Sequence, residues 1–140
     1  MEKPRLIKGG SFRDERGNMV FCNDFDMQQL KRFYYTSPSE KNLIRAWQGH
    51  KNESKWFHCI NGDFEIKIIE PDNWIDPSMH SKVYSFDLSE NSGDVLYIPG
   101  GYINGFKAKK PDCILMIFSD SSLEESKKDD IRFDIDKWQF

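Results

Sequence analysis

The sequence predicts one all-β domain, built as an antiparallel sandwich or barrel. Two segments, 64–68 and 83–88, alternate apolar and polar residues with a period of two, which is typical of half-buried strands. Many short runs of this kind, separated by residues that favour turns, are typical of sandwiches and barrels. A chain of 140 residues fits a single domain, so we expect residues 1–140 to fold as one unit.

Six further short runs, rich in β-branched and aromatic residues, complete the set of predicted strands. They are 19–22, 33–35, 43–47, 56–60, 95–98 and 114–118. Turns are predicted where Gly, Pro, Asn and Asp gather between the runs. These turns are 61–63, 71–73, 92–94 and 99–101. The longest stretch without a strand pattern, 70–81, contains two prolines and is expected to form a loop at one end of the barrel.

Helix signals are scarce in this sequence. The best candidate is 123–128, where Ser121 or Ser122 can act as the N-cap and two glutamates follow in the first turn. Trp138 is expected to hold the C-terminal tail against the barrel. Trp74, in the long loop, is expected to cap the end of the barrel, or alternatively to cover part of a ligand.

Composition and charge argue against several classes of function. The net charge is −3, and Lys and Arg are interleaved with Asp and Glu rather than gathered in a stripe, which argues against a nucleic-acid partner. The three cysteines, Cys22, Cys59 and Cys113, form no CxxC pair, and their odd number favours a reducing cytoplasm over a disulfide framework. The N-terminus opens no signal peptide and no long apolar run follows, so we expect a cytoplasmic protein without a membrane partner.

Two motifs stand out because their spacings match in order along the chain. The first runs Gln48-x-His50, Lys55 and Gly62, and the second runs Gly93, Pro99, Gly101 and Asn104. Together they resemble the two signature motifs of the cupin superfamily, which implies a double-stranded β-helix, or jelly-roll barrel. The turns at Gly62 and Gly101 are expected to need positive φ, which glycine adopts without steric cost.

The polar positions of the two motifs depart from those of metal-binding cupins. The superfamily has His, His and Glu in the first motif and His in the second, whereas this chain has Gln48, His50, Lys55 and Asn104. Imidazole and carboxylate hold divalent transition metals, and an ammonium group would repel them. We therefore expect no metal and no other cofactor, which disfavours a metal-dependent dioxygenase. The barrel is expected to favour an anion instead; the alternative is a decayed metal site without a new function.

Four segments resemble nucleotide-sugar cupins. Residues 12–17 resemble the D-x-R-G opening of dTDP-4-dehydrorhamnose 3,5-epimerases, and residues 98–106 resemble their P-x-G-x-A-H-G-F strand. Residues 44–51 resemble the R-G-x-H-x-H-K strand of dTDP-sugar 3,4-ketoisomerases, and residues 129–134 resemble the tail that both families share. The resemblance covers roughly residues 10–138 and identifies the chain as a member of this WxcM-like group of sugar cupins.

The resemblance also implies a set of binding residues. In these families arginines and a lysine hold the nucleotide diphosphate, and the matching residues here are Arg16, Arg45 and Lys55. Arg presents a planar fork to phosphate oxygens, and Lys presents a compact point charge. Two alternatives stay open. Arg16 could pair with the aspartate of its own turn, and the other two could form buried ion pairs with Glu53 or Glu65.

The catalytic residues of these families carry over less completely. The epimerases use a His as base at the position of Gln48 and a Tyr as acid at a position near Ile117. His50 is a candidate catalytic proton shuttle, because an unperturbed imidazole has a pKa near 6.5. The alternative is that His50 only hydrogen-bonds a phosphate or a sugar hydroxyl. Tyr35 is a candidate catalytic proton donor or substrate contact, with core packing as the alternative.

The resemblance, together with these residues, implies an isomerase or epimerase that acts on a dTDP-linked 4-keto-6-deoxysugar in surface polysaccharide biosynthesis. Moving a carbonyl from C4 to C3 passes through an enediol, which Lys51 or Lys55 and the amides of Gln48 and Asn104 would stabilise. The alternative function is a non-catalytic cupin that binds a nucleotide sugar or a glycan. Loss of the His at position 48 favours that alternative, and retention of His50 favours the enzyme.

Assembly is the last expectation. Short barrels leave edge strands, and a symmetry mate commonly covers such edges. The sugar cupins that this chain resembles are dimers that exchange N-terminal strands. We therefore expect a homodimer in which the segment 10–24 is exchanged.

Overall fold

The computed structural model describes residues 1–140 and consists of strands with one short helix. The elements are β1 (Arg5–Ile7), β2 (Gly10–Asp14), β3 (Gly17–Phe21), β4 (Arg32–Thr36), β5 (Ile44–His50), β6 (Lys55–Asn61), β7 (Asp63–Glu70), β8 (Lys82–Ser89), β9 (Val95–Ile98), β10 (Tyr102–Ala108), β11 (Ile114–Ser119), α1 (Leu123–Lys128) and β12 (Ile131–Arg132). The helix has 6 residues and is too short to cross a lipid bilayer.

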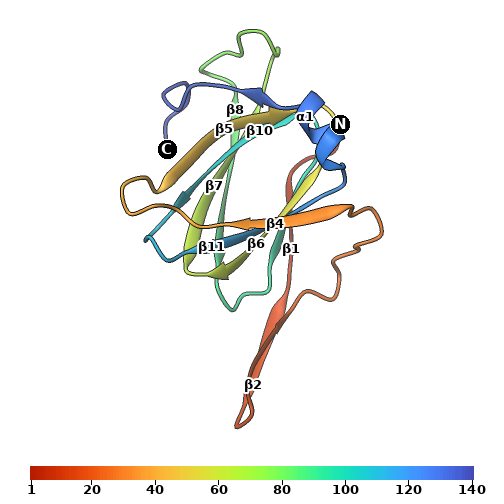
Figure 1. Ribbon diagram of the computed structural model, residues 1–140, viewed down its shortest axis with the longest axis vertical. Coiled ribbons are helices and arrows are strands. Elements are labelled where there is room, and N and C mark those ends of the chain that lie inside the picture. The colour runs from red at the N-terminus through yellow and green to blue at the C-terminus, as the bar shows by residue number, and fades with distance from the viewer.

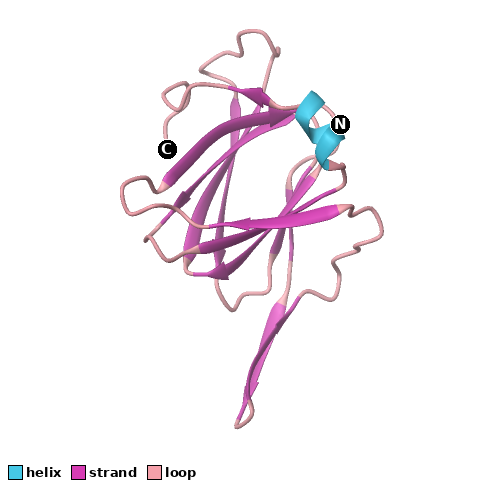
Figure 2. Cartoon of the chain, viewed as in Figure 1, coloured by secondary structure: helices cyan, strands magenta, loops and turns pink.

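Two antiparallel sheets of five strands face each other and enclose the core (Figures 1 and 2). The strand order is β1-β9-β6-β11-β4 in one sheet and β12-β5-β10-β7-β8 in the other. Most neighbours within a sheet are distant in sequence, as in a jelly roll. The main core is a cluster of 14 buried residues drawn from both sheets. The predicted all-β architecture is confirmed.

Every strand segment predicted from the sequence overlaps an observed strand. In β7 the side chains of Ile66 and Ile68 are fully buried, while the alternating Glu65 and Lys67 are partly exposed, so the pattern has its expected meaning. The strand pattern did not predict β1, β10 or β12, and β2 was expected only as part of the N-terminal segment 10–24. Strand β10 contains Gly105, which weakens any strand pattern. The structure needs glycine there, because a Cβ at this position would lie 2.7 Å from the Cβ of Ala46.

The predicted turns and helix are also found. Gly62 and Gly101 have φ of 81° and 100°, which confirms the expected positive values. Helix α1 begins after Ser122, whose hydroxyl accepts a hydrogen bond from the Glu125 N–H at 3.1 Å. The Glu125 carboxylate in turn accepts from the Ser122 N–H at 2.9 Å, which completes a capping box.

Two tryptophans fasten the long loop and the tail to the barrel. Trp138 is buried, packs edge-on against Trp47 with ring centroids 5.5 Å apart, and donates its indole N–H to the Ser78 carbonyl at 3.1 Å. Trp138 therefore holds the tail as expected. Trp74 lies against Gly49 of β5, where an added Cβ would come within 2.6 Å of its ring. Trp74 covers the sheet and is not part of the cavity described below.

The hairpin formed by β2 and β3 projects away from the barrel (Figure 1). Its two strands pair only with each other. Phe12 of β2 and Met19 of β3 are opposite each other and expose 57% and 67% of their surface. Exchange of this segment in a dimer stays a prediction.

Candidate functional site

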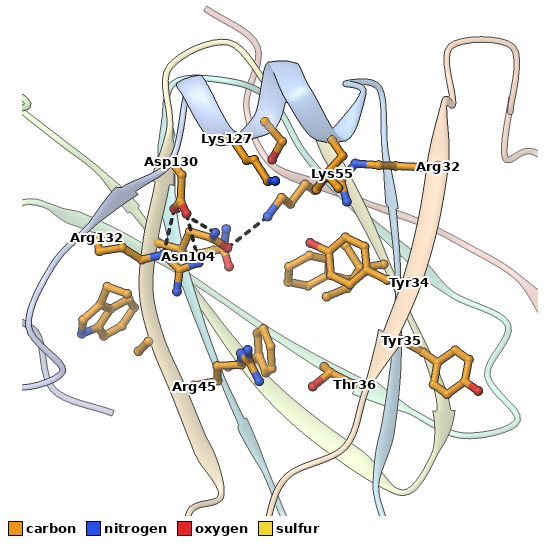
Figure 3. Close-up of a pocket in the computed structure, with 18 residues that line it drawn as sticks. Arg32, Tyr34, Tyr35, Thr36, Arg45, Lys55, Asn104, Lys127, Asp130 and Arg132 are labelled. Atoms are coloured by element: carbon orange, nitrogen blue, oxygen red, sulfur yellow. Dashed lines mark hydrogen bonds and ion pairs between the residues drawn. The ribbon is translucent and has the colours of Figure 1, made fainter.

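A cavity of about 360 Å³ lies between the two sheets and beneath α1 (Figure 3). Strands β4, β6 and β11 of one sheet line it together with β5 and β10 of the other. Residues of α1, of β12 and of the segment between them cover it. The cavity is therefore completed by a part of the chain that follows all the central strands in sequence.

An irregularity in β5 decides which of its side chains reach the cavity. The register between β5 and β10 shifts between Asn104 and Gly105. Trp47, at this point of β5, packs into a separate cluster with the C-terminal tail. Arg45 and Gln48 are three residues apart and would point to opposite faces of a regular strand. Because of the shift, both line the cavity.

The cavity carries an excess of positive charge. Its charged lining residues are Arg32, Arg45, Lys55, Lys127, Arg132 and one carboxylate, Asp130. The Arg32 guanidinium is paired with Glu53 at 3.2 Å, and that of Arg132 is paired with Asp130 at 2.8 Å. The other three cations have no carboxylate within ion-pair distance. Three uncompensated cations around one cavity suit a ligand that carries two or more negative charges.

Lys55 combines burial with a hydrogen bond to the neighbouring amide. It is 3% exposed, and its Nζ donates to Gln48 Oε1 at 3.1 Å. Gln48 Nε2 donates in turn to Asp130 Oδ1 at 3.0 Å. Burial lowers the pKa of Lys55 to about 8, although the negative charge of Glu53 opposes the shift. Lys55 therefore titrates close to neutral pH from a position inside the cavity.

His50 lies two residues beyond Gln48 on the same face of β5 but does not line the cavity. Its side chain is almost fully buried. Its Nδ1 lies 2.7 Å from the backbone carbonyl oxygen of Asp129. Burial and the charge of Lys55 lower the pKa of His50, while Glu53 and Asp129 oppose this. The imidazole is therefore neutral at neutral pH and able to act as a base.

The two tyrosines of β4 point in opposite directions (Figure 3). Tyr35, the candidate from the sequence, is among the lining residues, but it is 66% exposed and its ring points away from the cavity. Tyr34 points inward, and its ring centroid lies 5.1 Å from the Arg32 guanidinium and 5.9 Å from Lys55 Nζ. Burial raises the pKa of Tyr34 to about 12, so its hydroxyl stays protonated and can donate a hydrogen bond. Tyr34 pairs across the sheet with Ile117 of β11.

Of the other predicted binding residues, Asn104 lines the cavity, whereas Arg16 and Lys51 do not. Arg16 sits at the tip of the β2–β3 hairpin and pairs with Asp14 at 2.6 Å, which is the alternative that the sequence left open. Lys51 is exposed in the turn after β5, and its backbone N–H donates to the Asp129 carboxylate at 2.9 Å. Within one chain the structure thus brings together Arg45, Gln48, Lys55 and Asn104.

Five cavity residues with charged or phenolic side chains were not identified from the sequence: Arg32, Tyr34, Lys127, Asp130 and Arg132. The alternation of β4 places the first two on one face, but the pattern alone does not say which face is inside. The last two depend on the pairing of β12 with β5, in which Arg132 lies opposite Gln48. No local pattern predicts a pairing between segments so far apart.

No group of three or more His, Cys, Asp or Glu side chains is placed so that it could hold a metal ion. Four residues of this chain occupy the motif positions that hold metal in other cupins. Gln48, Lys55 and Asn104 line the cavity, and His50 lies next to it. An ammonium group and two amides are poor ligands for a divalent cation. The metal-free state remains a prediction, which elemental analysis of purified protein would test.

The jelly-roll barrel and its cation-lined cavity define a cupin suited to an anionic ligand. The chain belongs to the FdtA family, described as WxcM-like, C-terminal, whose model matches residues 2–138. A curated relative is the probable low-salt glycan biosynthesis epimerase Agl13 of Haloferax volcanii. It is 29% identical over 108 residues, which are 74% of this chain and 68% of that protein.

Solved structures with the same fold include two sugar-nucleotide enzymes. One is a mutant of the 3,4-ketoisomerase QdtA from Thermoanaerobacterium thermosaccharolyticum in complex with TDP-4-keto-6-deoxyglucose. It is 23% identical, with a TM-score of 0.71 over 95% of this chain and 89% of that chain. The other is dTDP-4-dehydrorhamnose 3,5-epimerase from Bacillus anthracis with TDP and PPi bound. It is 19% identical, with a TM-score of 0.75 over 95% of this chain and 79% of that chain. The cupin-type fold is confirmed.

Proposed function

We propose that this protein is an isomerase or epimerase of a dTDP-linked 4-keto-6-deoxysugar, working in the cytoplasm in surface polysaccharide biosynthesis. The observation that carries the proposal is the cavity itself, where three cations without carboxylate partners lie close to groups that can move protons. Membership of the WxcM-like family supports it, as do the glycan epimerase and the sugar-nucleotide enzymes named above.

The proposed diphosphate site is formed by Arg45 of β5 and Lys127 of α1. Both line the cavity, and neither is neutralised by a carboxylate. The guanidinium would bind two phosphate oxygens at once, and the ammonium would add a point charge from the covering helix. Lys55 lies deeper in the barrel, beside Gln48 and Asn104. We propose that this ammonium contacts the sugar-linked phosphate and that, together with the two amides, it stabilises an enediolate at the keto end of the sugar.

The proposed base is His50. Migration of the carbonyl from C4 to C3 breaks the C3–H bond; the proton passes to Nε2, and the bonding electron pair enters the enediolate. The hydroxyl proton then moves from O3 to O4, and the proton on Nε2 is returned to C4. Because His50 lies just outside the cavity wall, transfer requires the side chain of Gln48 or Lys55 to shift when the sugar binds. Tyr34 is the proposed hydrogen-bond donor to the sugar, in the role that we expected of Tyr35.

A non-catalytic cupin that binds a nucleotide sugar or glycan is the second candidate. The observation that favours it is Gln48, whose amide takes part in the hydrogen bonds to Lys55 and Asp130 but cannot carry a proton. A binding protein would keep the cation-lined cavity and need no base. The two candidates differ in proton exchange and not in affinity.

The test combines calorimetry with isotope exchange. We expect the protein to bind dTDP and to incorporate solvent deuterium into dTDP-4-keto-6-deoxyglucose, as followed by mass spectrometry. The variant His50→Gln should bind dTDP with unchanged affinity and lose exchange by about 10²–10⁴-fold. Binding without any exchange in the wild type would support the non-catalytic cupin. Absence of dTDP binding would contradict the proposed enzyme.

A further inference from the structure

Glu53 is a buried carboxylate for which the proposed chemistry has so far given no role. It lies in the turn between β5 and β6, and its side chain is 0% exposed. Its Oε2 accepts hydrogen bonds from Ser119 Oγ at 2.5 Å and from Arg32 Nη2 at 3.2 Å. Its Oε1 has no hydrogen-bond partner and lies 3.4 Å from His50 Nδ1. Carboxylates are rarely buried unless they are paired.

The hydrogen bond of His50 defines which of its nitrogens carries the proton. The carbonyl oxygen of Asp129 can only accept, so the Nδ1 that lies 2.7 Å from it must donate. In the neutral ring the lone pair is therefore on Nε2, which is buried without a partner. The carboxylate of Asp129 also accepts the backbone N–H groups of Lys51, Asn52 and Glu53 at 2.9 Å each. One residue of the tail thus fixes both the ring and the turn that carries Glu53.

The charges around His50 come from several elements. Lys55 of β6 disfavours the imidazolium, whereas Glu53, Asp129 and Asp130 favour it. Arg32 of β4 reaches the same site through its ion pair with Glu53. Of the three carboxylates, only that of Glu53 lies within ion-pair distance of the ring. Without it, the imidazolium would have no carboxylate within ion-pair distance, while the positive charges of Lys55 and Arg32 would remain nearby.

We propose that Glu53 is a positioning residue for His50: it stabilises the imidazolium formed when Nε2 accepts a proton and, together with the Asp129 carbonyl, keeps the proton of the neutral ring on Nδ1. In the proposed reaction that proton comes from C3 of the sugar and leaves again when C4 is protonated, so the ring ends as it began. The contribution to turnover rests on the proposed function. The effect on the tautomer and the charge of the ring does not.

The direct test is nuclear magnetic resonance of protein labelled with ¹⁵N in its histidine rings. We expect the neutral His50 of the wild type to carry its proton on Nδ1, and the Glu53→Gln variant to titrate at lower pH than the wild type. Ser119→Ala is the matched control, because it removes a hydrogen bond from the other oxygen of the same carboxylate; it should leave the titration nearly unchanged. The conservative Glu53→Asp variant keeps the charge and should shift the titration less than Glu53→Gln.

Three results would overturn the proposal: a wild-type proton on Nε2, an unshifted titration in Glu53→Gln, or an equal shift in Ser119→Ala. If Glu53→Gln does not fold, Glu53→Asp takes its place, and a titration no lower in pH than that of the wild type would overturn the proposal. In turnover, Glu53→Gln should lower kcat by at least roughly 10-fold with little change in KM, because the lost contact is to the base and not to the substrate. A wild type that exchanges no deuterium would contradict the proposed function while leaving the resonance result valid.

Discussion

Lys55 is expected to make ligand binding in the cavity depend on pH. Its lowered pKa of about 8 means that the ammonium is present below this pH and the neutral amine above it. We expect the affinity for dTDP, measured by calorimetry, to be nearly constant up to neutral pH and to fall as the pH rises through about 8. The variant Lys55→Met should show a much flatter profile over the same range, because its side chain cannot titrate. A wild-type affinity that rises with pH would contradict this role.

The same residue predicts a loss of binding energy. Lys55→Met removes a charged group that faces the ligand while keeping an unbranched apolar side chain in its place. We expect dTDP binding to weaken by roughly 1.5–3 kcal/mol, the range for a hydrogen bond to a charged group. Lys51→Met is the matched control, since the side chain of Lys51 lies outside the cavity. Equal losses in both variants would point to a general effect of charge and not to a contact.

For single residues, the sequence predicted which residue types belong to the site better than it predicted which way their side chains point. The motif spacing identified Gln48, Lys55 and Asn104, and all three line the cavity. It could not distinguish Tyr34 from Tyr35, because alternation separates the two faces of a strand without saying which is buried. Arg16 was selected by resemblance, but a hairpin that leaves the barrel carries it away from the cavity of its own chain.

Among the helices and strands, α1 shows most clearly how a local sequence pattern positions a residue of the cavity. The capping box of Ser122 and Glu125 fixes the start of the helix that holds Lys127 over the cavity. Ser122→Ala should cost about 1 kcal/mol, the usual price of a lost N-cap. For a domain of this size that corresponds to a fall in Tm of about 2–4 °C. Ser89→Ala, at an exposed position of β8, should leave Tm unchanged in the same calorimetric scan.

Elements with strong local signals were predicted, and those that depend on distant partners were not. Strand β7 has a regular alternation, and α1 has a cap, so both were found within a few residues of their observed bounds. Strand β12 has only two residues and exists because it pairs with β5. Strand β10 holds Asn104 and Gly105, which disfavour strands, yet tight packing against β5 requires the glycine.

For the whole molecule, the β2–β3 hairpin predicts that the protein forms a dimer. Its exposed pair, Phe12 and Met19, presents apolar surface that the barrel of the same chain does not cover. We expect a homodimer in light scattering at micromolar concentration. The double variant Phe12→Ser with Met19→Ser should shift the equilibrium to monomer, because it removes the apolar face of the hairpin.

The opposite face of the hairpin supplies the control. Arg13 and Asn18 form the adjacent cross-strand pair, and replacing both with Ser should leave the dimer intact. A wild type that is monomeric, or a dimer that persists in the Phe12 and Met19 variant, would contradict an interface at this hairpin. In the first case the prediction of an exchanged N-terminal segment would also fail.

The covering of the cavity by the last part of the chain has a consequence for biosynthesis. The turn at 51–53 is held by Asp129, which follows it by 76 to 78 residues. During translation, strands β1 to β11 are complete before α1 and β12 leave the ribosome. The central strands can therefore begin to pair before the residues that cover the cavity are available. Removal of residues 123–140 would likewise take Lys127, Asp130 and Arg132 from the cavity while leaving strands β1 to β11 in the chain.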